Sequence, residues 1–69
     1  MAINVQHIHS THCEITYTGK NDEQLYENMT ATMDDIQEEA ITILVKHDFI
    51  SAHVCDANTG ELLMIIERT

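Results

Sequence analysis

The sequence predicts an α+β fold, a two-layer sandwich in which one long helix covers one face of a four-stranded antiparallel sheet. Three observations support this prediction: a central stretch with apolar residues at helical spacing, alternating runs on both sides of it, and a clear turn between the last two runs. The 69 residues show no linker and no internal repeat. We therefore expect a single domain over residues 1–69, with its elements in the order ββαββ.

The first two strands are expected at Ala2–Ser10 and His12–Thr18. Apolar and polar side chains alternate in both runs with the two-residue period of a strand. A hairpin turn around residues 9–12 would join them, although this stretch lacks the glycine that short hairpin turns favour.

A helix is expected from Asn21 to Asp48. Asn21 is a suitable N-cap, and Gln24 can complete a capping box. A continuous helix of roughly 27 residues would span about 40 Å, against about 20 Å for a six-residue strand. We therefore expect either a break near residues 30–32, where Thr32 caps a second helix, or a partner that covers the excess length. The core stripe of this helix comprises Leu25, Met29, Met33, Ile36, Ala40, Ile43, Leu44 and His47.

The last two strands are expected at Phe49–Asp56 and Glu61–Glu67. Residues 56–60 predict the turn between them, since Asn58 tolerates a positive φ and Gly60 adopts one readily. The fourth strand is apolar on both faces, which is typical of a strand that is central or covered twice.

This arrangement leaves apolar side chains without cover. Phe49 and Ile8, with two residues of the last strand, would point away from the helix, and two further residues lie on the helix's outer side. Monomers seldom expose so much contiguous apolar surface. We therefore expect a homodimer or a partner protein. The alternative is that a face was assigned wrongly by one residue, which would exchange the two faces of a strand. The expected interface residues are Ile41, Val45, Leu63 and Ile65.

The charge balance is strongly acidic, with twelve acidic residues against three basic ones and a formal net charge of −9. Such a field repels phosphate, so direct binding to nucleic acid or to an anionic membrane is disfavoured, and a basic protein partner is favoured. The alternative is that the charge only maintains solubility. The sequence shows neither a signal peptide nor a membrane span, and its two cysteines are too few for a disulfide scaffold, so we expect a cytoplasmic protein with reduced thiols.

The leading functional hypothesis is a small acidic interaction module or inhibitor that presents a carboxylate-rich helix to a basic partner. A row of carboxylates on a helix can imitate a phosphate backbone and occupy a basic groove of a nucleic-acid-binding protein, as small acidic inhibitors of phages and mobile elements do as a class. The alternative is a solvated helix face. The expected binding residues are Glu23, Glu27, Asp34, Asp35 and Glu38.

The competing hypothesis is a metal-binding, metal-sensing or pH-sensing module. Five histidines occur in the chain, and alternate residues of a strand share a face, so pairs of imidazole and thiol groups would suit a transition metal such as zinc. The alternative is that these histidines only face solvent. The candidate ligands are His7, His9, His12, Cys13, His53 and Cys55.

An enzyme is not expected. His12, Cys13 and Glu14 are adjacent in sequence, but neighbouring strand residues point to opposite faces and form no catalytic set. No glycine-rich loop that would hold a phosphate is present.

Overall fold

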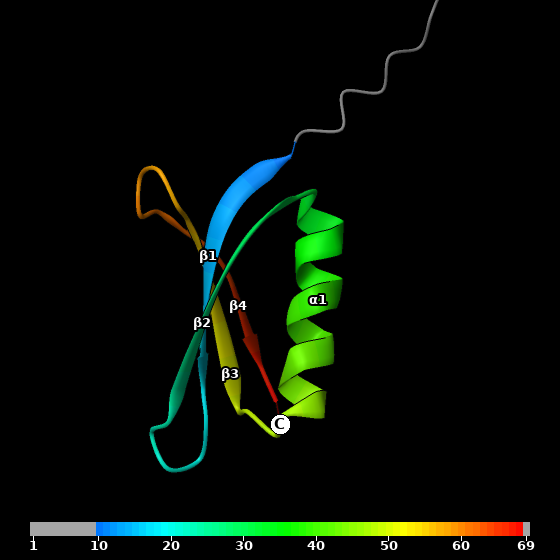
Figure 1. Cartoon of the computed structure of the whole chain (residues 1–69), viewed down its shortest axis with the longest axis vertical. Coiled ribbons are helices and arrows are strands. Elements are labelled where there is room, and N and C mark those ends of the chain that lie inside the picture. The colour runs from blue at the N-terminus through cyan, green and yellow to red at the C-terminus, as the bar shows by residue number, and fades with distance from the viewer. Residues whose placement is uncertain (1–9, 69) are drawn as a thin grey trace, which may run out of the picture.

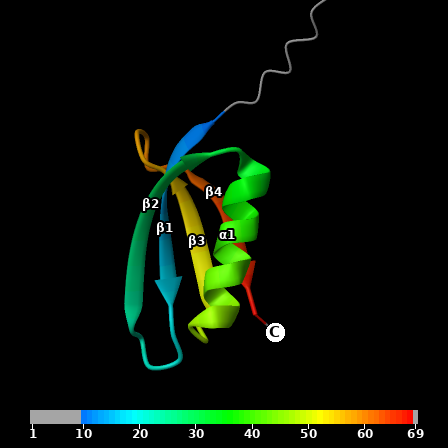
Figure 2. The same cartoon turned by 45° about the vertical axis from the view of Figure 1, so that its right-hand side comes forward.

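The computed structural model describes residues 10–68 and has the predicted two-layer architecture (Figure 1). The four strands form one antiparallel sheet in the order β2-β1-β3-β4, and the helix lies against one face of it (Figure 2). The α+β sandwich with ββαββ order is therefore confirmed. The elements are β1 (Thr11–Thr18), β2 (Gln24–Ala31), α1 (Met33–Lys46), β3 (Ser51–Asp56) and β4 (Leu62–Glu67).

The first hairpin differs from the expected one. Apart from Ser10, the predicted strand at Ala2–Ser10 lies outside the described residues, and β1 pairs instead with β2. The predicted turn around residues 9–12 is wrong, because Thr11 and His12 already belong to β1. The true turn follows Gly19, whose N–H donates to the carbonyl of Glu23 at 2.8 Å.

The helix is half as long as predicted. Residues 24–31 form β2, and α1 begins only at Met33, so the proposed N-cap at Asn21 is wrong. The error has a physical cause: a spacing of four residues is one turn of a helix but also two periods of a strand. No break between two helices occurs, because the segment before Thr32 is a strand. The expected helix start at Thr32 is nonetheless correct, since Thr32 is the N-cap of α1 and its Oγ1 accepts from the N–H of Asp35 at 3.2 Å.

The last two strands lie where they were predicted, but β4 is an edge strand rather than a central one. A bulge between Val54/Cys55 and the facing part of β4 leaves Leu63 without a register partner. Phe49, which was expected on the open side of the sheet, is instead buried in the core just before β3.

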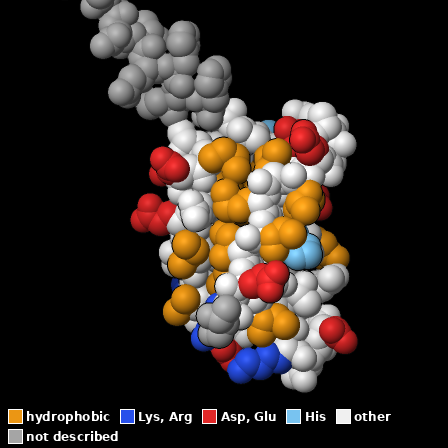
Figure 3. Space-filling model, turned by 180° about the vertical axis from the view of Figure 1, so that it is seen from behind, with side chains coloured by type: hydrophobic (Ala, Val, Ile, Leu, Met, Phe, Trp, Pro, Cys, Tyr) orange, Lys and Arg blue, Asp and Glu red, His pale blue; other side chains and the backbone are white. Residues whose placement is uncertain are grey.

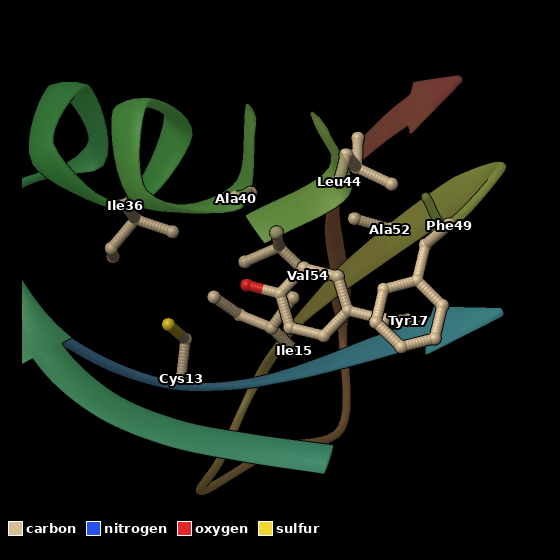
Figure 4. Packing of buried hydrophobic residues seen from close by; sticks show 9 residues of the cluster. All are labelled: Cys13, Ile15, Tyr17, Ile36, Ala40, Leu44, Phe49, Ala52 and Val54. Atoms are coloured by element: carbon tan, nitrogen blue, oxygen red, sulfur yellow. The ribbon is translucent and has the colours of Figure 1, made fainter. Parts of the chain in front are cut away.

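The core lies between α1 and the two central strands, β1 and β3 (Figure 4). Within it Tyr17 and Phe49 stack on each other, with ring centroids 5.7 Å apart. In the described part of the chain, no helix has the length and apolar character needed to cross a membrane. The buried residues are Cys13, Ile15, Tyr17, Ile36, Ala40, Leu44, Phe49, Ala52 and Val54.

Candidate functional site

The outer surface of α1 carries three of the five carboxylates predicted to bind a partner. Asp34, Asp35 and Glu38 are all exposed. Asp34 and Asp35 occupy the first turn, where the helix dipole favours negative charge, so they stabilise the element that presents them. Ile36, Ala40 and Leu44 fix the opposite side of α1 in the core.

The other two predicted carboxylates lie elsewhere, because the helix begins after them. Glu23 ends the β1–β2 turn, and its carboxylate accepts from the N–H of Asn21 at 3.2 Å. Glu27 belongs to β2 and pairs in register with the buried Ile15, so its side chain is on the sheet face toward α1. The predicted single row of five carboxylates on one helix is therefore wrong.

The three basic residues gather near the C-terminal end of α1, away from its acidic first turn. Lys20 and Arg68 both contact Asp48, at 3.3 and 2.9 Å, and Lys46 is in the last turn of the helix. Lys20 and Arg68 hold the pKa of Asp48 below its usual range. Figure 3 shows the Lys and Arg side chains at the lower end of the molecule. Among the described residues, no ion pair involves Asp34, Asp35 or Glu38.

A second group of polar side chains, which the sequence did not reveal, lies between the sheet and the helix. The hydroxyl of Tyr17 donates to Oε1 of Glu27 at 3.0 Å. A hydrogen bond to Glu27 and the negative charge of Glu27, followed by partial burial, raise the pKa of Glu39 in α1. Burial, then the contact with Glu27, raises the pKa of Tyr17 strongly, so its hydroxyl remains a donor. We call these three residues the carboxyl cluster.

The sequence contained a signal for the carboxyl cluster, but it is visible only if residues 24–31 are assigned the two-residue period of a strand. If residues 24–31 are interpreted as a strand, Glu27 falls on the same side as Leu25 and Met29 and therefore faces the core layer. The approach of Glu39 to Glu27 depends on how α1 crosses the sheet, which local spacing does not encode.

The predicted metal ligands do not come together in the described part of the chain. His7 and His9 lie outside it, while His12 and Cys13 point to opposite faces of β1. Cys13 is buried beneath α1, and burial, then the charge of Glu27, raises the pKa of its thiol. Across residues 10–68, no group of three His, Cys, Asp or Glu side chains is placed to hold a metal ion. This finding includes the two other candidates, His53 and Cys55, which belong to β3. Metal binding that uses the first nine residues stays a prediction.

The predicted interface residues are mostly at the surface. Ile41, Val45 and Ile65 are 45%, 63% and 49% exposed, whereas Leu63 is half-buried at the bulge. Leu62, at 51% exposed, adds to this surface.

Charge and geometry are thus the evidence on which a functional proposal rests. No protein-family model, curated protein or solved structure matches the chain.

Proposed function

We propose that this protein is a small acidic interaction module whose helix α1 binds a basic protein partner. The supporting observation is the separation of charge. Asp34, Asp35 and Glu38 are exposed and form no ion pair within residues 10–68, while Lys20 and Arg68 are paired with Asp48 near the other end of the helix. A surface of one sign attracts a partner of the opposite sign and orients it during encounter.

The rigidity of α1 supports the same proposal. The helix is capped by Thr32 and anchored in the core by Ile36, Ala40 and Leu44, so the backbone that carries its outer carboxylates is fixed before binding. The groove of a nucleic-acid-binding protein is one suitable partner surface, because it is built to accept a row of negative charges. Occupation of that groove would inhibit the partner.

Charge reversal on the helix tests this proposal. We expect the double variant Asp34→Lys/Glu38→Lys to bind an arginine-rich probe peptide at least about tenfold more weakly than the wild type, because two attractive contacts become repulsive. Fluorescence anisotropy of the labelled peptide at low and at physiological salt measures the change, and circular dichroism checks that the helix is retained.

The matched control is Glu14→Lys/Glu23→Lys. It makes the same change in net charge, but on the open sheet face and at the end of the β1–β2 turn, where both residues are exposed. The control should bind more tightly than the helix variant. Equal weakening of both variants would show that only net charge matters, and the proposal would be wrong.

A further inference from the structure

The free edge of β4 has backbone groups available for pairing. The N–H of Arg68 donates to the carbonyl of Ile50 at 2.9 Å, which fixes the alternation of hydrogen bonds between β3 and β4. By that alternation Met64 and Ile66 bond to β3, whereas the N–H and C=O of Ile65 and Glu67 point away from the sheet.

The two edges of the sheet differ in how well they are protected. Most natural edge strands carry lysine, proline or other features that prevent pairing. On β2 the outward-directed backbone groups belong to Gln24, Tyr26, Asn28 and Thr30, which are mostly polar. By contrast β4 reads Leu-Leu-Met-Ile-Ile-Glu, with five apolar residues in succession. The β4 edge is therefore the one suited to take another strand.

Apolar side chains border the β4 edge on both faces of the sheet. Leu62 and Ile65 pair in register with Cys55 and His53 on the face away from α1, and the helix borders the other face. Glu39 meets Glu27 of β2, so the opposite flank of α1, which carries Ile41 and Val45, faces β4. Figure 3 shows hydrophobic side chains in a band down this side of the molecule. We call the exposed apolar residues of β4 and of this flank of α1 the β4 patch, defined as Ile41, Val45, Leu62 and Ile65.

We propose that a second copy of this chain covers the β4 patch by antiparallel pairing of β4 with its own counterpart, centred on Ile65. A two-fold axis perpendicular to the sheet makes the strands antiparallel and keeps α1 of both copies on the same face. The two Ile65 residues would then exchange backbone hydrogen bonds, and one continuous sheet would run through both copies.

Charge complementarity favours a second copy as the occupant. Antiparallel pairing centred on Ile65 places Arg68 of one β4 opposite Leu62 of the other, next to Glu61 in the β3–β4 turn. Arg68 binds Asp48 through Nη1, but its side chain is 43% exposed, so its remaining guanidinium N–H groups can donate to Glu61 of the other copy. The backbone pairing of β4 uses no residue of α1, so the inference does not rest on the proposed partner binding.

Proline at the edge gives a selective test. The N–H of Ile65 is not used within the monomer, so Ile65→Pro should leave the fold intact and remove two hydrogen bonds across the axis. We expect sedimentation velocity on the full chain to show a wild-type dimer and at least a roughly 30-fold weaker association for this variant. Tyr26→Pro is the matched control, since its N–H points outward from the other edge.

A crosslink tests the same contact without a change in backbone chemistry. In a Cys55→Ser background, Ile65→Cys should form a disulfide-linked dimer under mild oxidation, because facing residues of a hydrogen-bonded pair are about 5.5 Å apart at Cα. Tyr26→Cys should form it much more slowly. A wild-type chain that stays monomeric at all concentrations, a dimer unaffected by Ile65→Pro, or equal crosslinking at both edges would overturn the inference.

Discussion

Tyr17→Ala is expected to lower the free energy of unfolding by about 3–5 kcal/mol, as other large-to-small changes of buried aromatic residues do. The side chain of Tyr17 is fully buried, its ring stacks on Phe49, and its hydroxyl donates to Glu27. A domain of this size has a total stability of only roughly 3–10 kcal/mol. The variant should therefore be mostly unfolded, or nearly so, at physiological temperature.

Urea denaturation followed by circular dichroism measures this effect. Tyr17→Phe keeps the ring and should cost about 1.5–3 kcal/mol, the loss of a hydrogen bond to a carboxylate. Tyr26→Ala is the matched control, since Tyr26 is 61% exposed and should tolerate truncation with little loss. Similar stabilities of Tyr17→Ala and Tyr26→Ala would show that Tyr17 does not anchor the core.

The fold class could be predicted from the sequence because most elements show the apolar spacing that is typical of their secondary structure. Residues 33–46 repeat at helical spacing, and the alternation around Ala52 and Val54 identified the inward face of β3 correctly. The region of β2 was misassigned because its few apolar residues, Leu25 and Met29, are four apart, and that spacing satisfies a helix and a strand equally. The length mismatch between helix and strand pointed to the true boundary at Thr32.

The candidate site was less predictable, because its contacts join residues far apart in the chain. Asp34, Asp35 and Glu38 were identified by local helical spacing alone. Glu27 and Glu39 meet only because β2 and α1 lie against each other, and that packing is set by the whole core. The same reason explains β4: its sequence indicates cover on both faces, but strand order, which local patterns do not fix, made it an edge.

The carboxyl cluster makes stability depend on pH in a direction that can be derived from Glu39. Its pKa is raised in the folded protein by Glu27, so the folded state holds this proton more tightly than the unfolded chain does. The resulting stabilisation is fully present below the ordinary pKa of 4.5 and is lost as the pH rises through the raised value. Of the groups around it, Tyr17 and Cys13 remain neutral at neutral pH, and only the charge of Lys46 opposes the shift.

Glu39→Gln is therefore expected to stabilise the protein at neutral pH by about 0.5–1 kcal/mol, the usual cost of facing like charges. Glutamine keeps the shape and can still hydrogen-bond to Glu27, but it has no charge to repel. The gain should shrink as the pH falls towards the ordinary pKa, because the wild-type residue then becomes neutral as well. Thermal unfolding of both proteins across this pH range measures the difference, in which contributions from Asp48 and Asp56 cancel.

Glu38→Gln is the control for this prediction, because it removes the same charge from the exposed side of the same helix. It should give a smaller gain that stays constant over the pH range. If the two variants gain equally at neutral pH, relief of the overall net charge explains the effect, and Glu27 and Glu39 do not interact. If Glu39→Gln alone gains, the two carboxylates repel each other across the sheet–helix boundary, and protonation of Glu39 tightens the contact between β2 and α1.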